Sequence, residues 1–79
     1  PNPFNPSTKI SFYLDKSEKI SMEIYNLNGK LVDVLIDNKF FSAGMHDVVY
    51  KPKGLSSGNY YYSLKTEGQV LVRKLTYIK

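Results

Sequence analysis

The sequence predicts an all-β domain, an Ig-like antiparallel β-sandwich of six or seven strands. Apolar and polar residues alternate with a period of two in several short segments, and turn-forming residues separate these segments every 8 to 12 residues or so. No segment shows helical spacing over about 11 residues. A chain of 79 residues with 42% hydrophobic content is long enough for one domain. A small closed barrel is the alternative architecture.

The first two strands are expected at residues 8–14 and 19–26, where the alternation is clean. In each segment one parity is apolar and the other is polar or aromatic, which is typical of a half-buried antiparallel strand. The inward residues are expected to be Ile10, Phe12, Leu14, Ile20, Met22 and Ile24.

A hairpin turn is expected at residues 26–30, because Asn28-Gly29 tolerates the positive φ angles that tight turns need. The third strand, 30–36, has a blurred alternation, so we expect a twist or bulge near Leu35. Its core residues are expected to be Val32, Val34 and Ile36. Residues 37–46 are then expected to form a turn, a short edge piece around Phe40 and Phe41, and a second turn at Ala43-Gly44.

The second half of the chain predicts three more strands, at residues 46–51, 58–66 and 69–79. The breaks between them contain proline, glycine and serine in 51–58 and glycine in 66–69. Val48 and Tyr50 are expected on one side of the first of these strands, and Tyr60, Tyr62 and Leu64 on one face of the second. In the last strand one parity holds Leu71, Arg73, Leu75 and Tyr77. A register change near Arg73 would be needed to bury Val70 or Val72 as well.

Residues 1–7 are expected to form a proline-rich linker, and residues 8–79 the folded domain. Proline fixes φ and lacks a backbone N–H, so Pro1, Pro3 and Pro6 favour an extended, semi-rigid tether. We therefore expect an upstream cargo to which this module is attached. A boundary drawn by an experimenter is the alternative explanation.

Composition argues against several function classes. The formal net charge is +4 and the pI is near 9.3, but the basic residues are scattered among acids, so nucleic acid is not an expected partner. There is no cysteine for a disulfide or a thiolate metal site. No apolar stretch reaches the roughly 18 residues of a membrane-spanning helix.

Neither a catalytic nor a metal or cofactor site is expected. His46 is the only histidine, and although Ser42 and Asp47 are near it in sequence, we expect it to be an exposed residue at a strand entry. Asp15 and Glu18 bracket a turn, yet calcium usually needs more oxygen ligands at close spacing. Residues 54–58 lack the lysine and helix of a phosphate-binding loop.

Three successive tyrosines are candidates for an aromatic platform on which a sugar or a base stacks. Alternate side chains of a strand point to opposite faces, so only Tyr61 of Tyr60, Tyr61 and Tyr62 is expected to point outward, with Tyr13 or Tyr25 as candidate neighbours. The segment Asn5-Pro6-Ser7 is not a glycosylation acceptor, because proline occupies its middle position.

Five segments in order resemble a known family. PNPFNPST (1–8), IYNLNGKLV (24–32), AGMH (43–46), GLSSGNYYYSL (54–64) and RKLTYIK (73–79) are similar to the type A C-terminal sorting domain of type IX secretion. That family is related to the Ig-like domains of flagellar hook-capping proteins. The resemblance covers essentially the whole chain. Tyr77 and Asn28 depart from the family pattern, and the first departure is expected to affect signal strength.

The resemblance implies a non-catalytic address label at the end of a larger exported protein. The implied partners are a covalently continuous cargo domain, the outer-membrane type IX translocon, and its shuttle or surface protease. The implied location is secreted or at the cell surface of a Gram-negative bacterium, reached through the periplasm and outer membrane. The alternative is an Ig-like accessory module for spacing, adhesion or carbohydrate contact.

The sorting function predicts a recognition surface built from the last strand and two loops. Its expected residues are Arg73, Lys74, Leu75, Tyr77, Ile78, Lys79, Gly29, Leu55 and Gly58. Arg73 and Lys74 would supply charge, and the apolar residues would complete the core or add to a strand edge on the receptor. The alternative is a conventional core strand in which Arg73 and Lys74 act as edge gatekeepers.

Overall fold

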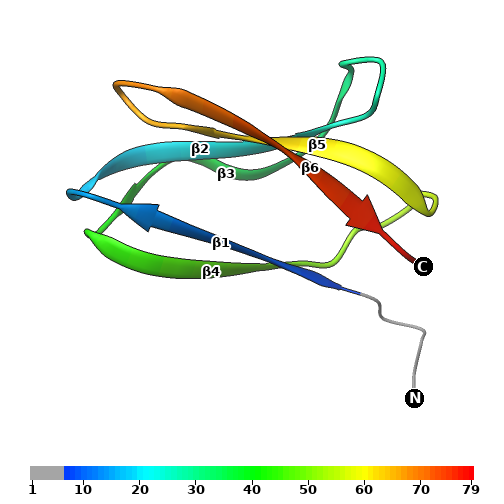
Figure 1. The fold of residues 1–79 in the computed structure, drawn as a ribbon, viewed down its shortest axis with the longest axis horizontal. Helices are drawn as coiled ribbons and strands as arrows, with labels where there is room; N and C mark the ends of the chain where they lie inside the picture. The colour runs from blue at the N-terminus through cyan, green and yellow to red at the C-terminus, as the bar shows by residue number, and fades with distance from the viewer. Residues whose placement is uncertain (1–6) are drawn as a thin grey trace.

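The computed structural model describes residues 7–79, which fold into six strands and no helix. The strands are β1 (Thr8–Leu14), β2 (Glu18–Tyr25), β3 (Leu31–Phe41), β4 (Gly44–Tyr50), β5 (Gly58–Lys65) and β6 (Val70–Tyr77). Figure 1 shows their two layers, a sheet of order β1-β4 and a sheet of order β3-β2-β5-β6, both antiparallel. The predicted antiparallel β-sandwich is confirmed.

Part of the expected organisation is not described by the structure. Residues 1–6, on which the linker prediction falls, lie outside the described residues. Within residues 7–79, no helix has the length and apolar character needed to cross a membrane.

For five of the predicted strands, both ends agree with those of an observed strand to within two residues. They are β1, β2, β4, β5 and β6, and each carries the apolar alternation that predicted it. Alternation succeeds here because the inner faces of both sheets pack against each other while the outer faces meet solvent. The sandwich core contains Ile10, Phe12, Leu14, Ile20, Met22, Ile24, Ile36, Tyr50, Tyr60, Leu64, Leu75 and Tyr77.

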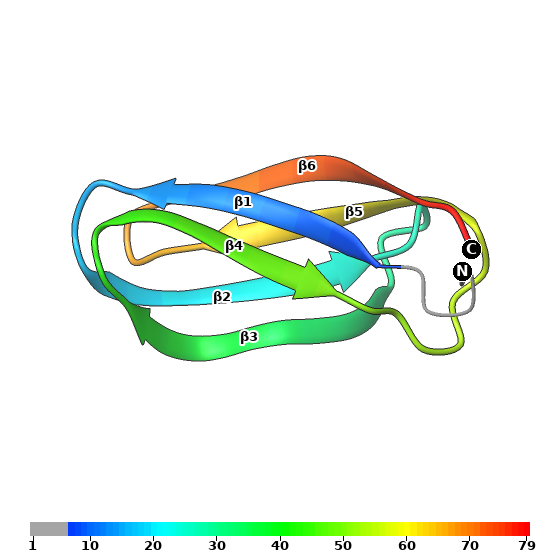
Figure 2. The ribbon, with the colours of Figure 1, turned by 90° about the horizontal axis from the view of Figure 1, so that it is seen from below.

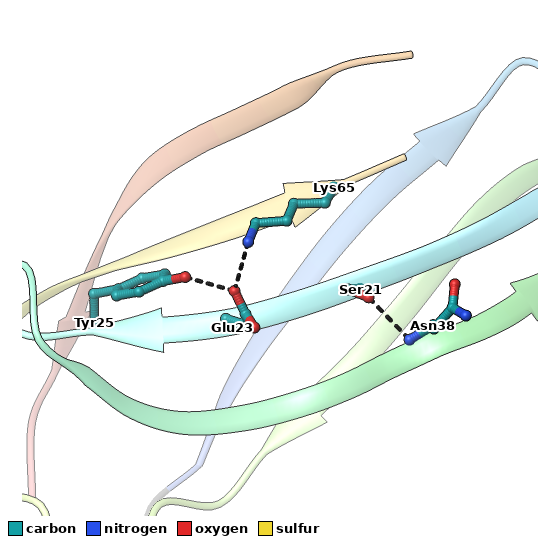
Figure 3. Close-up of polar contacts among 5 residues, drawn as sticks. All are labelled: Ser21, Glu23, Tyr25, Asn38 and Lys65. Carbon is teal, nitrogen blue, oxygen red and sulfur yellow. Dashed lines mark hydrogen bonds and ion pairs between the residues drawn. The ribbon is translucent and has the colours of Figure 1, made fainter. Parts of the chain in front are cut away.

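The third strand differs from its prediction. In place of a strand ending at residue 36 and a separate edge piece, β3 continues through Phe41. Asn38 has a φ of 49°, and its backbone N–H donates to Oγ of Ser21 on β2 over 2.9 Å (Figure 3). The register against β2 shifts at this point. The expected turn is therefore a bulge, which lets the strand bend without ending.

A second bulge in β3 explains which of its residues are buried. Met22 pairs with Ile36 and Glu23 with Val34, so Leu35 is an extra residue, as predicted. The extra residue reverses the alternation. Ile36 is buried, but Val34 is 46% exposed and Leu35 packs against the core, so the prediction of Val34 as a core residue is wrong.

The last strand keeps one register along its length. Every residue of β6 pairs with β5 in sequence, from Val70 opposite Lys65 to Tyr77 opposite Gly58. Val70 and Val72 consequently stay on the outer face and are 58% and 53% exposed. The register change considered for Arg73 does not occur, and only the second half of β6 enters the core.

Candidate recognition surface

The segments of the predicted recognition surface meet at one end of the sandwich. Figure 2 shows the β2–β3 turn, the β4–β5 loop and the end of β6 gathered there. Gly58 pairs with Tyr77, and the backbone N–H of Lys79 donates to Oγ of Ser57 over 2.8 Å. We call residues 26–30, 51–58 and 78–79 the loop end, and the opposite turns, 15–17, 42–43 and 66–69, the hairpin end.

The β2–β3 turn is held by one side chain that sequence reasoning did not select. Oδ1 of Asn26 accepts hydrogen bonds from the backbone N–H groups of Asn28 and Lys30, over 2.9 and 3.0 Å. Gly29 has a φ of 82°, which a residue with a Cβ adopts only under strain. The sequence did contain a signal for this contact. Asparagine side chains cap backbone turns, and Asn26 lies at the start of the predicted turn, two residues before Asn28.

The β4–β5 loop is anchored rather than free. Leu55 is partly buried against the core. The hydroxyl of Tyr60, whose ring lies in the core, donates to the carbonyl oxygen of Ser56 over 2.6 Å. With the bond from Lys79 to Ser57, the loop is tied to both β5 and the end of β6. The loop end is thus a preorganised surface.

Arg73 and Lys74 do not form one basic patch. Successive side chains of a strand point to opposite faces, and Arg73 pairs with Tyr62 while Lys74 pairs with Tyr61. Both side chains are exposed on β6, which is an edge strand. Nη1 of Arg73 donates to the carbonyl oxygen of Val72 over 3.0 Å. This placement suits a charge that protects an edge from pairing with other chains.

The apolar residues of the C-terminal segment divide into two groups. Leu75 and Tyr77 are 7% and 4% exposed and belong to the core, whereas Ile78 is 76% exposed. A partner can contact Ile78 and Lys79 without disturbing the fold, but it cannot reach Leu75 or Tyr77 in the folded domain. Ile78 and Lys79 thus present the surface, whereas Leu75 and Tyr77 hold the strand in place.

The loop end carries a local excess of positive charge. Its segments contain Lys30, Lys51, Lys53 and Lys79 and no aspartate or glutamate. All four lysines are exposed. Four of the eleven basic residues of the sequence therefore lie in the segments of this end, and this charge favours an acidic surface on a partner.

The outer face of the larger sheet carries a polar network that the sequence did not single out (Figure 3). The hydroxyl of Tyr25 donates to Oε1 of Glu23, and Nζ of Lys65 lies 3.0 Å from the same oxygen. The Tyr25 hydrogen bond first, and then Lys65, hold the pKa of Glu23 below its ordinary value. The same ion pair raises the pKa of Lys65. The cross-strand partners Tyr25 and Tyr61 lie on this face, as their parity predicted.

His46 is not the exposed residue that was expected. Its ring is partly buried and stacks on Phe12, with ring centroids 5.4 Å apart. It also makes a T-shaped contact with Phe41, with ring centroids 5.1 Å apart. Its Nε2 is 2.7 Å from the carbonyl oxygen of Ser42, while Asp47 points the other way and accepts a hydrogen bond from Ser11. These contacts give His46 a packing role and do not assemble a Ser-His-Asp arrangement.

Metal-ligating side chains are not clustered in the part of the chain that the structure describes. No group of three or more His, Asp or Glu side chains among residues 7–79 is placed to hold a metal ion. Asp15 and Glu18 line a groove at the hairpin end.

Comparison with known proteins gives one match. A family described as the secretion system C-terminal sorting domain matches residues 1–79. No curated protein and no solved structure matches the chain.

Proposed function

We propose, starting from the fact that the chain belongs to the secretion system C-terminal sorting domain family, that the loop end is the surface by which the secretion machinery recognises it. The family match over the whole chain shows a C-terminal sorting signal for type IX secretion. It also implies a cargo protein that this machinery delivers to the cell surface or the extracellular space. This family is not known as catalytic.

The contacts at the loop end favour this surface over the other predicted recognition residues, such as Arg73 and Lys74. Ile78 and Lys79 are exposed, yet the backbone of Lys79 is fixed to Ser57 and the loop is fixed to the core through Leu55 and Tyr60. A rigid surface loses little conformational entropy on binding. The loop-end segments contain four exposed lysines and no aspartate or glutamate, which favours an acidic site on the partner.

The same proposal includes the tether, the membrane that the cargo crosses and the further partners. Residues 1–7 serve as the tether to an upstream cargo, and the translocon in the outer membrane of a Gram-negative bacterium is the acceptor, with its shuttle or surface protease as further partners. A relationship to the Ig-like domains of hook-capping proteins would explain the sandwich topology. The proline-rich composition of residues 1–7 supports the tether.

A secretion assay with surface variants tests the proposal. Deleting residues 73–79 is a poor test, because it also removes Leu75 and Tyr77 from the core. Ile78→Ser combined with Lys79→Glu changes only exposed side chains. In a bacterium with type IX secretion, a periplasm-directed fluorescent reporter fused to this variant should stay in the periplasm, while the unchanged domain carries it to the surface.

Val70→Ser is the matched control, since Val70 is an exposed apolar residue of β6 far from the loop end. It should leave export unchanged. Thermal unfolding of each purified domain checks that both variants fold. Normal surface display of the Ile78→Ser, Lys79→Glu reporter would refute the loop end as the recognition surface.

A further inference from the structure

A groove opens into the sandwich at the hairpin end, opposite the loop end. It has a volume of about 520 Å³ and lies between the β1–β2 turn and the β5–β6 hairpin. Its lining includes the buried side chains of Leu14 and Leu64 and the exposed side chains of Tyr13 and Leu71. The groove therefore reaches apolar core atoms from the outside.

The groove adjoins an unpaired strand edge. β1 pairs only with β4, so the backbone N–H and C=O groups along its other edge have no strand partner in residues 7–79. Figure 2 shows β1 and β6 on the same side of the sandwich. The two-stranded sheet does not cover all of the four-stranded sheet, and Leu71, on the inner-facing parity of β6, is 40% exposed. One more strand beside β1 would cover it.

The residues that line the groove carry a net charge opposite to that of the whole domain, although Lys19 and Lys65 lie with Glu67 around a smaller neighbouring hollow. Asp15, Glu18 and Glu67 line the groove, against the single basic side chain of Lys16, whereas the chain has a formal net charge of +4. Within residues 7–79 these three carboxylates take part in none of the side-chain hydrogen bonds or ion pairs, in contrast to Glu23, Asp33 and Asp47. They are available to an incoming partner.

We propose that this groove binds an extended basic segment of a partner protein, which adds to the free edge of β1 as a third strand. Main-chain hydrogen bonds to β1 supply affinity, and an apolar side chain of the segment packs on Leu71 and Leu64. Lysine or arginine side chains meet Asp15, Glu18 and Glu67 at the rim. The groove is at the end opposite the loop end, so the inference goes beyond the sorting surface and does not depend on it.

A labelled peptide tests the chemistry of the occupant. The probe is a fluorescein-tagged seven-residue peptide of alternating lysine and valine, added to the whole 79-residue chain and followed by fluorescence anisotropy. Glu67→Lys should weaken binding about tenfold, because one attraction becomes a repulsion. Asp37→Lys makes the same charge change at an exposed residue outside the groove and should have little effect. Equal weakening by both variants would overturn the proposal.

Two further comparisons test the strand geometry. Leu71→Ser should weaken binding, whereas Val72→Ser, which changes the exposed neighbour on the outer face, should not. The same peptide methylated on alternate backbone nitrogens keeps its charges but loses donors to β1, so its binding should be lost. Undiminished binding of the methylated peptide would rule out strand addition. A concentration-dependent dimer that Glu67→Lys abolishes would identify a second copy as the occupant and overturn the proposed partner.

Discussion

The hydroxyl of Tyr50 on β4 donates to Oδ2 of Asp33 on β3 over 2.7 Å, and this hydrogen bond joins the two sheets of the sandwich. The other oxygen of Asp33 accepts from the backbone N–H of Val34 over 2.9 Å. A carboxylate at the sheet interface is tolerated because both of its oxygens have donors. This bond helps to fix the position of β3 relative to β4. The alternation of apolar and polar residues does not by itself set that position.

Tyr50→Phe should lower the free energy of unfolding by about 1 to 3 kcal/mol, because it leaves one oxygen of a partly buried carboxylate without its donor. Urea denaturation measures the change. Tyr61→Phe, at an exposed tyrosine with no such bond among residues 7–79, is the control and should change stability little. A Tyr50→Phe protein as stable as the unchanged domain would show that the link between the sheets contributes nothing.

Alkaline pH should weaken the domain through the same residue. Burial first, and then the hydrogen bond to Asp33, raise the pKa of Tyr50 well above its ordinary value of 10.0. A raised pKa in the folded state contributes stability that is complete below about pH 10 and is lost as pH rises above it. Absorbance titration should therefore show that Tyr50 ionises only with unfolding, as the part of the tyrosine signal that Tyr50→Phe removes.

Acid should remove the contribution of Glu23. Its pKa is lowered in the folded state by the Tyr25 hydroxyl and then by Lys65, so its stabilising effect is present above the ordinary value of about 4.5 and is lost as pH falls through the lower folded pKa. Glu23→Gln should flatten the fall in melting temperature below that pH. Asp37→Asn is the control. An unchanged acid profile in Glu23→Gln would mean that the network has no effect on stability.

Removing the hydroxyl of Ser63 should stabilise the domain. Ser63 is 3% exposed, and its Oγ is buried without a hydrogen-bond partner among the described residues. An unsatisfied buried polar group is costly, so Ser63→Ala should raise the free energy of unfolding by about 1 kcal/mol. Denaturant unfolding measures this, with Ser42→Ala at an exposed position as the control. A loss of stability in Ser63→Ala would reveal a partner for the hydroxyl.

Much of the fold was predictable because alternation reports one-sided burial directly. The inward parities of β1, β2 and β5 were right for this reason. β3 was not predictable in detail, since its three register shifts depend on the strand opposite. Ser21 supports the bulge at Asn38, and these residues are 17 positions apart in sequence. No local pattern reports such a pairing.

The candidate surface was only partly predictable for a related reason. Gly29 was found from turn chemistry, which is local. The bond from Lys79 to Ser57 and the gathering of lysines at the loop end depend on segments that are distant in sequence. The groove at the hairpin end was missed, because Asp15 and Glu67 come together only when the β1–β2 turn faces the β5–β6 hairpin.

The sequence by itself determined the β class, the positions of most strands and the family of this domain, because period-two patterns and turn residues act within a few positions of each other. Tertiary structure alone decided which inward-facing residues are covered. Leu71 and Leu75 share a parity on β6, yet Leu75 is buried and Leu71 is 40% exposed. The physical reason is that a two-stranded sheet covers only part of a four-stranded one.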